Sequence, residues 1–310
     1  MIKRTLYFGN PAYLSRRNEQ LVLRLPEVEK NDTLPDAFKK EAHVTIPIED
    51  IGIVILDEQR LIITQSLIDG LLENNVALIT CDKTHHPTGL MLNLAGNKLQ
   101  SAKFKAQLDA GQPLVKQLWQ QTIRAKILNQ AAVLKGSGIE TGNMMKWASE
   151  VKSGDPDNLE ARAAAYYWKN LFPQIAGFRR EREGIPPNNL LNYCYAILRA
   201  IVARSLVGSG LLPTLGIHHR NQYNHYCLAD DIMEPYRPFA DALVLEIMKN
   251  GEDFTELTPS VKKQLLGIAT VDVLFDDDRS PLMVATQRTT SSLAKCFELT
   301  SKKLVYPKLL

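Results

Sequence analysis

The spacing of apolar residues changes near residue 90, and this change constrains the fold more than any other feature of the chain. Upstream, Leu21, Leu23 and Leu25 recur at every second position, which is typical of strands with one buried face. Downstream, apolar residues recur at helical spacing. The pattern predicts an α+β fold, in which an N-terminal β-rich domain (residues 1–90) is followed by a larger all-α domain (residues 91–310).

The same periodicities predict the individual elements, and they place the change between the domains near residues 83–97. In the first domain we expect a strand at 5–10, a hairpin at 13–25 with its bend at 17–20, two strands within 43–57, a helix at 63–75, a strand at 76–82 and a turn at 84–89, where Pro87 and Gly89 act as breakers. In the second domain we expect helices at 97–110, 113–135, 158–172, 189–207, 236–250 and 280–303.

Basic residues concentrate in two stretches, although the whole chain has a formal net charge of only +3. Residues 98–152 hold 9 basic and 3 acidic side chains, and residues 161–220 hold 8 and 2, so each stretch carries +6. Such a concentration in a near-neutral protein suggests a surface that binds a polyanion such as DNA. A solvated helix face of the same charge is the ordinary alternative.

The chain is expected to be a soluble cytoplasmic protein that does not contact a membrane. Its N-terminal segment, MIKRTLYFGN, lacks the apolar core of a signal peptide. No apolar run is expected to approach the roughly 20 residues that a membrane span needs. The four cysteines (Cys81, Cys194, Cys227 and Cys296) are scattered and form no CxxC pair, which suits buried thiols in a reducing compartment.

Several common enzyme signatures are missing from the sequence. There is no HExxH, no GxxxxGK[ST], no GxGxxG after a strand and no GxSxG. The sequence therefore gives no support to a zinc protease, a nucleotide-hydrolysing motor or a Rossmann dehydrogenase.

The segment GDPDNLEARAAAYYWKNLF opens a helix with a glutamate on its inward face. Asp155 or Asp157 can cap this helix, because a side-chain oxygen accepts a free N–H of the first turn. Glu160 then shares a face with Ala164 and Tyr167, and a carboxylate on a small, aromatic face needs a partner. Two interpretations remain open here, a functional carboxylate and a glutamate that stabilises the helix N-terminus.

The segment GIHHRNQYNHYCLADDIMEPYRP gathers further metal-capable groups. A helix that starts near Asp230 would place four polar residues on one face: Asp230, Glu234, Arg237 and Asp241. His218 and His219 precede that helix in a loop. Two carboxylates with one imidazole suit Mg²⁺ or Mn²⁺, and the imidazole favours Mn²⁺. A polar loop before a capped helix is the alternative.

Four segments together resemble the CRISPR-associated integrase family, that of the first CRISPR-associated protein, which inserts new spacers. They are LYFGNPAYLSRRNEQLVL, NLEARAAAYYWKNLF, PPNNLLNYCYAILRA and LGIHHRNQYNHYCLADDIMEPYRP, and the resemblance covers essentially the whole chain. LADD with MEPYRPFAD looks most like the variant that accompanies a single-protein, RNA-guided effector. The resemblance implies a β-rich N-terminal domain and a helical C-terminal domain that carries the active site.

The resemblance also implies a site for Mg²⁺ or Mn²⁺ and its ligands. These catalytic ligands would be Glu160, His219 and Glu234, although many relatives have aspartate at the last position. The family pattern G-x-x-H selects His219 over His218. Residues expected to position or support the site are Asp231, Arg237, Asn192 and Tyr193.

The basic stretches supply candidates for DNA contact, because phosphates neutralised by lysine or arginine release their counterions. Six residues are expected to contact the DNA backbone: Lys103, Lys105, Arg124, Arg179, Arg180 and Arg182.

The implied reaction is transesterification, in which the 3′-hydroxyl of a spacer end attacks a phosphodiester of the CRISPR repeat. Two alternatives stay open, a stand-alone structure-selective metal nuclease and a non-catalytic DNA-binding scaffold. The implied partners are double-stranded DNA (spacer donor and repeat), a second copy in a homodimer, a small second adaptation protein that bridges two dimers, and the RNA-guided effector nuclease. Strand edges of the β-rich domain are the expected dimer contact.

Overall fold

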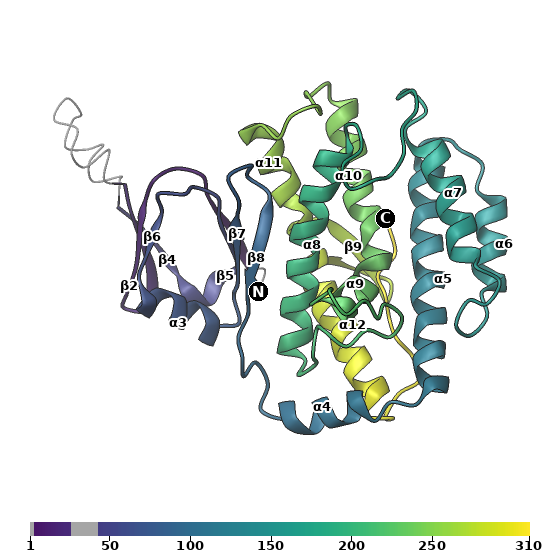
Figure 1. Cartoon of the computed structure of the whole chain (residues 1–310), viewed down its shortest axis with the longest axis horizontal. Coiled ribbons are helices and arrows are strands. Elements are labelled where there is room, and N and C mark those ends of the chain that lie inside the picture. The colour runs from purple at the N-terminus through teal and green to yellow at the C-terminus, as the bar shows by residue number, and fades with distance from the viewer. Residues whose placement is uncertain (1–2, 26–42) are drawn as a thin grey trace. The chain divides into compact units, whose positions relative to one another are not determined.

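The computed structural model describes residues 3–25 and 43–310 of the chain. The chain divides into two compact units, Met1–Gly96 and Asn97–Leu310 (Figure 1). Unit 1 is rich in strands and unit 2 is mostly helical, so the α+β class predicted from the sequence is confirmed. The change between the units falls within the expected range of 83–97, and residue 90 itself lies inside a strand.

The described residues of unit 1 form two four-stranded sheets. The first has the order β1-β5-β7-β8, with bounds Arg4–Phe8, Ile51–Leu56, Ala77–Cys81 and Pro87–Met91. Its first three strands run parallel, whereas β8 is antiparallel to β7. The second has the order β4-β3-β2-β6, with bounds His43–Pro47, Gln20–Arg24, Tyr13–Arg17 and Ile62–Ile63.

The predicted hairpin is present as β2 and β3, which pair antiparallel from Tyr13 opposite Arg24 to Arg17 opposite Gln20. Its turn residues, Asn18 and Glu19, both have positive φ (49° and 57°). A two-residue turn with positive φ matches the right-handed twist of the strands that it joins. The bend therefore lies within the predicted residues 17–20.

The expected turn at 84–89 is wrong in its second half. Pro87 and Gly89 lie in β8, and the turn before it is closed by a hydrogen bond from the Asp82 N–H to the His86 carbonyl. A proline is tolerated there because it is the first residue of an edge strand, where a ladder N–H is not required. Pro87 and Gly89 therefore did not break the strand.

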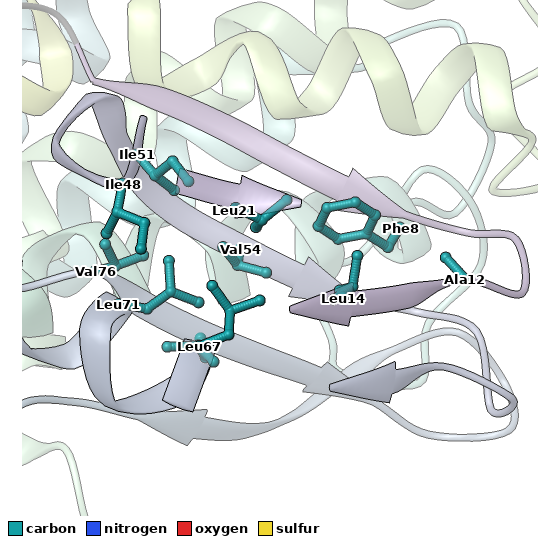
Figure 2. Close-up of a cluster of buried hydrophobic side chains, with 11 residues drawn as sticks. Phe8, Ala12, Leu14, Leu21, Ile48, Ile51, Val54, Leu67, Leu71 and Val76 are labelled. Atoms are coloured by element: carbon teal, nitrogen blue, oxygen red, sulfur yellow. The ribbon is translucent and has the colours of Figure 1, made fainter. Parts of the chain in front are cut away.

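Side chains from both sheets and one helix meet in a single core (Figure 2). The helix is α3 (Gln65–Glu73), which turns Leu67 and Leu71 inward, as its helical spacing predicted. Strand β5 is buried almost throughout, because it lies between β1 and β7 in the sheet. Leu14 and Leu21 contribute from the hairpin.

Unit 2 is built from nine α-helices within the described residues. They are α4 (Gln100–Leu108), α5 (Gln112–Gly136), α6 (Gly142–Glu150), α7 (Leu159–Leu171), α8 (Asn188–Gly208), α9 (Cys227–Met233), α10 (Arg237–Lys249), α11 (Pro259–Leu266) and α12 (Leu282–Phe297). Two 3₁₀ turns accompany them, η2 (Glu234–Tyr236) and η3 (Gly267–Thr270).

The unit is not purely helical, which corrects the all-α expectation. An antiparallel hairpin joins β9 (Asp272–Phe275) to β10 (Asp278–Pro281) before α12 begins. Asp276 and Asp277 form its two-residue turn with positive φ (49° and 69°). The sequence reads VDVLFDDDRS there, and its apolar alternation is too short to predict a strand among helices.

Helix α8 is long and apolar enough to cross a membrane by length and composition, which corrects the expectation that no segment would be. Of its most apolar window, 83% is buried inside the protein, as in the core helix of a soluble fold. Its neighbours include α9, α10, α11 and α12.

Helix α5 organises the other side of the unit, where it packs against α6, α7, η2 and α10. Figure 1 shows α5 and α7 side by side. Apolar residues of α5 such as Trp119, Ile123 and Ile127 are buried. The same buried side also carries Thr122, Lys126, Asn129 and Gln130, so polar groups are held inside the helical unit.

Candidate active site

A lysine ammonium lies between two of the predicted ligands. Lys126 Nζ on α5 is 2.6 Å from Glu160 Oε1 on α7 and 2.6 Å from Glu234 Oε2 on η2. The Lys126 side chain is 11% exposed, Glu234 is 7% exposed and Glu160 is 25% exposed. Two carboxylates that are 74 positions apart in sequence numbering, at 160 and 234, thus meet at one cationic atom.

Glu160 is positioned by the capped start of α7. Both carboxylate oxygens of Asp155 accept backbone hydrogen bonds, from the N–H groups of Leu159 and Glu160, each at 3.0 Å. These bonds satisfy free donors of the first turn, so Asp155 has the capping role that the sequence allowed. Asp157, the alternative, instead accepts from Lys152 at 2.8 Å.

Glu234 lies where two helices meet and not inside one. α9 begins at Cys227, earlier than the predicted start near Asp230, and the chain tightens into η2 at Glu234 before α10 begins at Arg237. Pro235 suits this junction because its missing N–H would have no helical partner. Its carbonyl accepts a hydrogen bond from Asn129 Nδ2 of α5 at 2.8 Å, which ties the junction to α5.

Charged neighbours keep Glu234 ionised. Burial alone would raise the pKa of its carboxyl, but the charges of Arg237 and Lys126 outweigh burial and lower the pKa to about 2. Arg237 Nε donates to Glu234 Oε1 at 2.8 Å. Glu234 is therefore a permanent anion at neutral pH, as a ligand for a hard cation must be.

His219 is held by a buried aspartate. Asp231 makes three hydrogen bonds: it accepts from the backbone N–H of His218 (2.9 Å) and from the backbone N–H of His219 (3.1 Å), and it pairs with Nδ1 of the His219 ring (2.5 Å). The bond to the ring, with smaller contributions from nearby acidic groups that include Glu234, raises the pKa of His219. Asp231 is thus placed to orient the imidazole, as the sequence predicted for a supporting residue.

Steric crowding explains why glycine occupies position 216, the first position of the G-x-x-H pattern. A Cβ at Gly216 would lie 2.3 Å from the carbonyl oxygen of His219 and 2.7 Å from Asp231 Oδ2. Both of these atoms belong to the arrangement that holds the histidine. Any side chain at Gly216 would therefore push the loop away from Asp231. The ring of His218 stacks on Trp119, with ring centroids 4.0 Å apart.

The structure brings the predicted ligands together only in part. Within residues 3–25 and 43–310, no group of three His, Cys, Asp or Glu side chains is already arranged to hold a metal ion. Glu160 and Glu234 share Lys126, and His219 pairs with Asp231. Asp230, on the expected acidic face, points elsewhere and binds Arg199 Nε at 2.6 Å.

A cavity of about 210 Å³ adjoins Glu234 and Lys126. It is lined by Lys126, Gln130, Trp168, Arg180, Tyr195, Glu234, Arg237 and Asp241. The guanidinium carbons of Arg180 and Arg237 lie 5.0 and 4.6 Å from the ring centroid of Tyr195, within the range of cation–π contacts. The cavity therefore combines three cationic side chains with aromatic walls.

A second cavity, of about 470 Å³, adjoins His219. Its walls include Arg220, Asn221, Gln222 and Asn224 from the loop after the histidine, together with Gln112 at the start of α5. These side chains are polar hydrogen-bonding groups, and Arg220 adds a positive charge.

The two α8 residues predicted to support the site have different positions. Asn192 accepts a hydrogen bond from Arg180 at 2.8 Å and so holds a residue that lines the first cavity. Tyr193 lies under Lys262 of α11, with the Lys262 ammonium 6.0 Å from its ring centroid. The tyrosine that reaches the cavity is Tyr195, two positions further on and on another face of the helix.

The residues predicted to contact DNA differ in their exposure. Lys105, Arg124, Arg179 and Arg182 are exposed, as DNA contact requires. Lys103 is half-buried, and its ammonium donates to the Ser209 carbonyl at 3.0 Å at the end of α8. A lysine that satisfies a helix C-terminal carbonyl has a structural role, and the contact of Lys103 with DNA stays a prediction.

Four residues of the site were not found from the sequence: Lys126, Gln130, Trp168 and Tyr195. A signal for the first two was present. Thr122, Lys126, Asn129 and Gln130 recur at spacings that place them on one side of the predicted helix, next to Trp119 and Ile123. Polar residues on an otherwise apolar helix face need buried partners.

Asp241 makes the stability of unit 2 depend on pH. Burial raises the pKa of its carboxyl to about 6, although hydrogen bonds from Tyr195 and Tyr167 oppose the rise. The unfolded carboxyl titrates near pH 3.9, so the folded state holds a proton that the unfolded state loses between about pH 4 and 6. The free energy of unfolding should therefore fall by about 3 kcal/mol as pH rises through this window.

In Asp241→Asn this pH dependence should disappear, since asparagine does not titrate. Urea unfolding of wild type and variant between pH 4 and 7 measures it. Glu246→Gln is the matched control, because it removes an exposed carboxylate from the same helix and should leave the pH slope in place. Equal slopes in wild type and Asp241→Asn would contradict the assignment.

Comparison with known proteins agrees with this architecture. Residues 6–262 match the family model described as CRISPR associated protein Cas1. The chain is 36% identical over 313 residues to the CRISPR-associated endonuclease Cas1 of Neisseria meningitidis serogroup C (strain 8013), and the alignment covers 100% of this chain and 97% of the relative.

Two solved structures share the fold at low sequence identity. A casposase bound to integration product superposes with a TM-score of 0.76 at 19% identity, covering 98% of this chain and 92% of that one. A chain of a Cas6-RT-Cas1–Cas2 complex superposes with a TM-score of 0.71 at 20% identity, covering 98% of this chain and 36% of that one. The family model and the full-length relative together establish that this chain belongs to the CRISPR-associated Cas1 family.

Proposed function

We propose that this chain is a metal-dependent DNA integrase and endonuclease of CRISPR adaptation, which joins 3′-hydroxyl ends of spacer DNA to the CRISPR repeat by transesterification. The observation that carries the proposal is the convergence of Glu160 and Glu234 on one cationic atom, Lys126 Nζ. Family membership supports DNA chemistry, because the full-length relative is named an endonuclease.

The donor set fits Mg²⁺ or Mn²⁺. Carboxylate oxygens are the ligands that these hard cations prefer, and an imidazole nitrogen favours Mn²⁺ of the two. Both glutamates already reach one cation, which supports a shared metal position. Glu160, Glu234 and His219 are the proposed ligands, the histidine because it matches the family pattern G-x-x-H.

When bound, the ion would stabilise the charge that grows on the phosphodiester and lower the pKa of the attacking hydroxyl. The protein contributes orientation. Asp231 holds Nδ1 of His219, which leaves Nε2 as the nitrogen available to a ligand. Arg237 fixes Glu234, and with Arg180 it lines the adjoining cavity, where their guanidinium groups would hold phosphate oxygens.

If water attacks the phosphodiester in place of a DNA 3′-hydroxyl, the same site acts as a nuclease. The full-length relative is named an endonuclease, which favours this as a second activity. The two activities share a metal, whereas a DNA-binding scaffold would need none.

Metal should control the reaction. We expect Mn²⁺ or Mg²⁺ to support DNA strand transfer and EDTA to stop it, because the paired glutamates would then lack their divalent partner. Zn²⁺ should substitute poorly, since the proposed ligands include two carboxylates and no thiolate. A gel assay of labelled DNA with each metal measures this, and strand transfer that resists EDTA would rule the mechanism out.

Binding to duplex DNA should weaken steeply with salt and depend little on sequence. Each neutralised phosphate releases a counterion, so the logarithm of affinity falls linearly with the logarithm of salt concentration. Lys105→Glu and Arg124→Glu should each weaken binding and reduce the magnitude of the salt slope by about 1 or more. Fluorescence anisotropy at several salt concentrations measures both effects.

Lys103→Glu serves as the contrast in that experiment. Its ammonium satisfies the Ser209 carbonyl, so this variant should lower the free energy of unfolding as well as DNA affinity. Binding by the wild type that does not respond to salt would contradict an electrostatic DNA surface.

We further propose that the protein works in the cytoplasm as a homodimer on double-stranded DNA. A spacer has two ends, and one copy of the glutamate pair offers one reaction centre, so two-ended joining needs at least two copies. A small second adaptation protein would bridge two dimers, in keeping with the Cas1–Cas2 pairing named for one protein of the same fold. Exposed strand edges of unit 1 are the proposed dimer contact, and the RNA-guided effector nuclease is a further proposed partner.

A further inference from the structure

Lys126 contacts the two carboxylates that the proposed function assigns to a metal. Its ammonium is almost completely buried, and both of its ion pairs are with these glutamates, at 2.6 Å each. We infer that Lys126 is a built-in substitute for the divalent ion: it holds Glu160 and Glu234 together in the metal-free protein, and the incoming ion displaces its ammonium into the adjoining cavity. The inference rests on the proposed function.

The two cations cannot share the position. A divalent ion would sit about 2.0–2.2 Å from the same carboxylate oxygens. The ammonium now lies 2.6 Å from both, so the ion and Nζ would overlap if the lysine stayed in place. Two positive charges at such a distance also repel each other strongly in a buried site. Metal binding therefore requires the lysine side chain to move.

Without a cation, the paired carboxylates would be unstable. The Glu234 side chain is 7% exposed, and burying a carboxylate without a partner is costly. The Lys126 ammonium supplies the opposite charge, and its two ion pairs join α5 to α7 and to η2. The lysine thus keeps the glutamates charged and correctly separated before metal arrives.

The fold provides a place for the displaced ammonium. Lys126 lines the cavity of about 210 Å³, and so does Gln130, which lies one turn further along the same face of α5. Gln130 is 3% exposed, and its Oε1 is a buried acceptor that has no hydrogen-bond partner among the described residues. A buried amide oxygen without a donor is unusual, and an ammonium supplies three donors.

Arg180 and Arg237 line the same cavity, and their positive charges oppose the arrival of a third cation. A phosphodiester held against the metal would add negative charge at this point. The displaced ammonium would then join the two guanidinium groups around a phosphate, so substrate binding and displacement of the lysine would favour each other.

The first test is calorimetric titration of Mn²⁺ into wild type and Lys126→Met, which keeps an unbranched side chain only one atom shorter and removes its charge. With no internal cation to displace, the variant should bind Mn²⁺ at least about tenfold more tightly, a change of about 1.4 kcal/mol. Lys135→Met removes an exposed lysine from the same helix and should bind as wild type does. Equal or weaker binding by Lys126→Met would overturn the inference.

Adding Glu160→Gln to Lys126→Met identifies the site of the gain. If the double variant loses the gain in Mn²⁺ affinity, the additional binding arises at the glutamate pair. If the double variant keeps the gain, the additional binding arises elsewhere, and the inference is overturned. If neither wild type nor Lys126→Met binds Mn²⁺, the metal assignment of the proposed function fails, and the inference fails with it.

A second measurement uses the unaltered chain, in case Lys126→Met does not fold. Crystals soaked in Mn²⁺ and measured at the manganese edge should show an ion bound by Glu160 and Glu234, with Lys126 Nζ turned toward Gln130 Oε1. An ion on the two glutamates with Nζ still in contact with both carboxylates would overturn the inference. Absence of an ion there would instead contradict the proposed metal site.

Discussion

Glu160→Gln and Glu234→Gln should each abolish strand transfer, with a loss on the order of 1000-fold or about 4 kcal/mol of transition-state stabilisation. Glutamine keeps the shape of the side chain but removes the charge that holds a divalent ion. His219→Ala should have a comparable effect, because it removes the third proposed ligand. Single-turnover joining of a labelled DNA end measures all three, and circular dichroism checks that the fold is intact.

Two histidine variants are the controls for this prediction. His225→Ala changes an exposed residue of the same loop region and should keep full activity. His218→Ala should keep most activity, since its ring stacks on Trp119 while only its backbone N–H reaches Asp231. Full activity in a variant of Glu160, His219 or Glu234 would remove that residue from the site.

Gly216→Ala should lose strand transfer by about 100-fold and lower the free energy of unfolding by about 2 kcal/mol. The added methyl group would lie 2.3 Å from the His219 carbonyl oxygen and 2.7 Å from Asp231 Oδ2. Because these are a backbone atom and a fully buried carboxylate, neither can yield without moving the His219 loop. Misplacing a catalytic group by about 1 Å is enough for a loss of this size.

Gly267→Ala is the matched control, because a Cβ at Gly267 meets no heavy atom within 4 Å and φ there is not positive. Urea unfolding and the joining assay, run on both variants, separate a local effect at the site from a general effect of adding a methyl group. Wild-type stability and activity in Gly216→Ala would show that the loop does not depend on this glycine.

The parts of the fold that local chemistry determines could be predicted. The hairpin at 13–25 and the helix at 63–75 follow from apolar spacing, and the Asp155 cap follows from the free donors of a first helical turn. The closeness of Glu160 and Glu234 was expected only through the family resemblance, since nothing in the spacing of two distant segments places them together.

Tertiary packing decided the rest. A lysine on a basic helix is usually solvated, and Lys126 is buried only because α7 and η2 cover that side of α5. Tyr193 and Tyr195 are equally plausible in the sequence, but the rotation of α8 turns only Tyr195 toward Arg180 and Arg237. Lys103 was selected for its charge, whereas its position beside the end of α8 gives its ammonium a carbonyl to bind.

The fate of a labelled 3′ end is the most direct test of the claim that this chain joins DNA through its glutamate pair. Short duplex donors labelled near the 3′ end are incubated with Mn²⁺ and a supercoiled plasmid that contains the repeat, with and without the small partner protein. We predict label covalently attached to the plasmid with wild type, and none with EDTA or with Glu234→Gln. Nicked plasmid that carries no label would contradict joining and leave a nuclease, and plasmid that is bound but uncut would leave a scaffold.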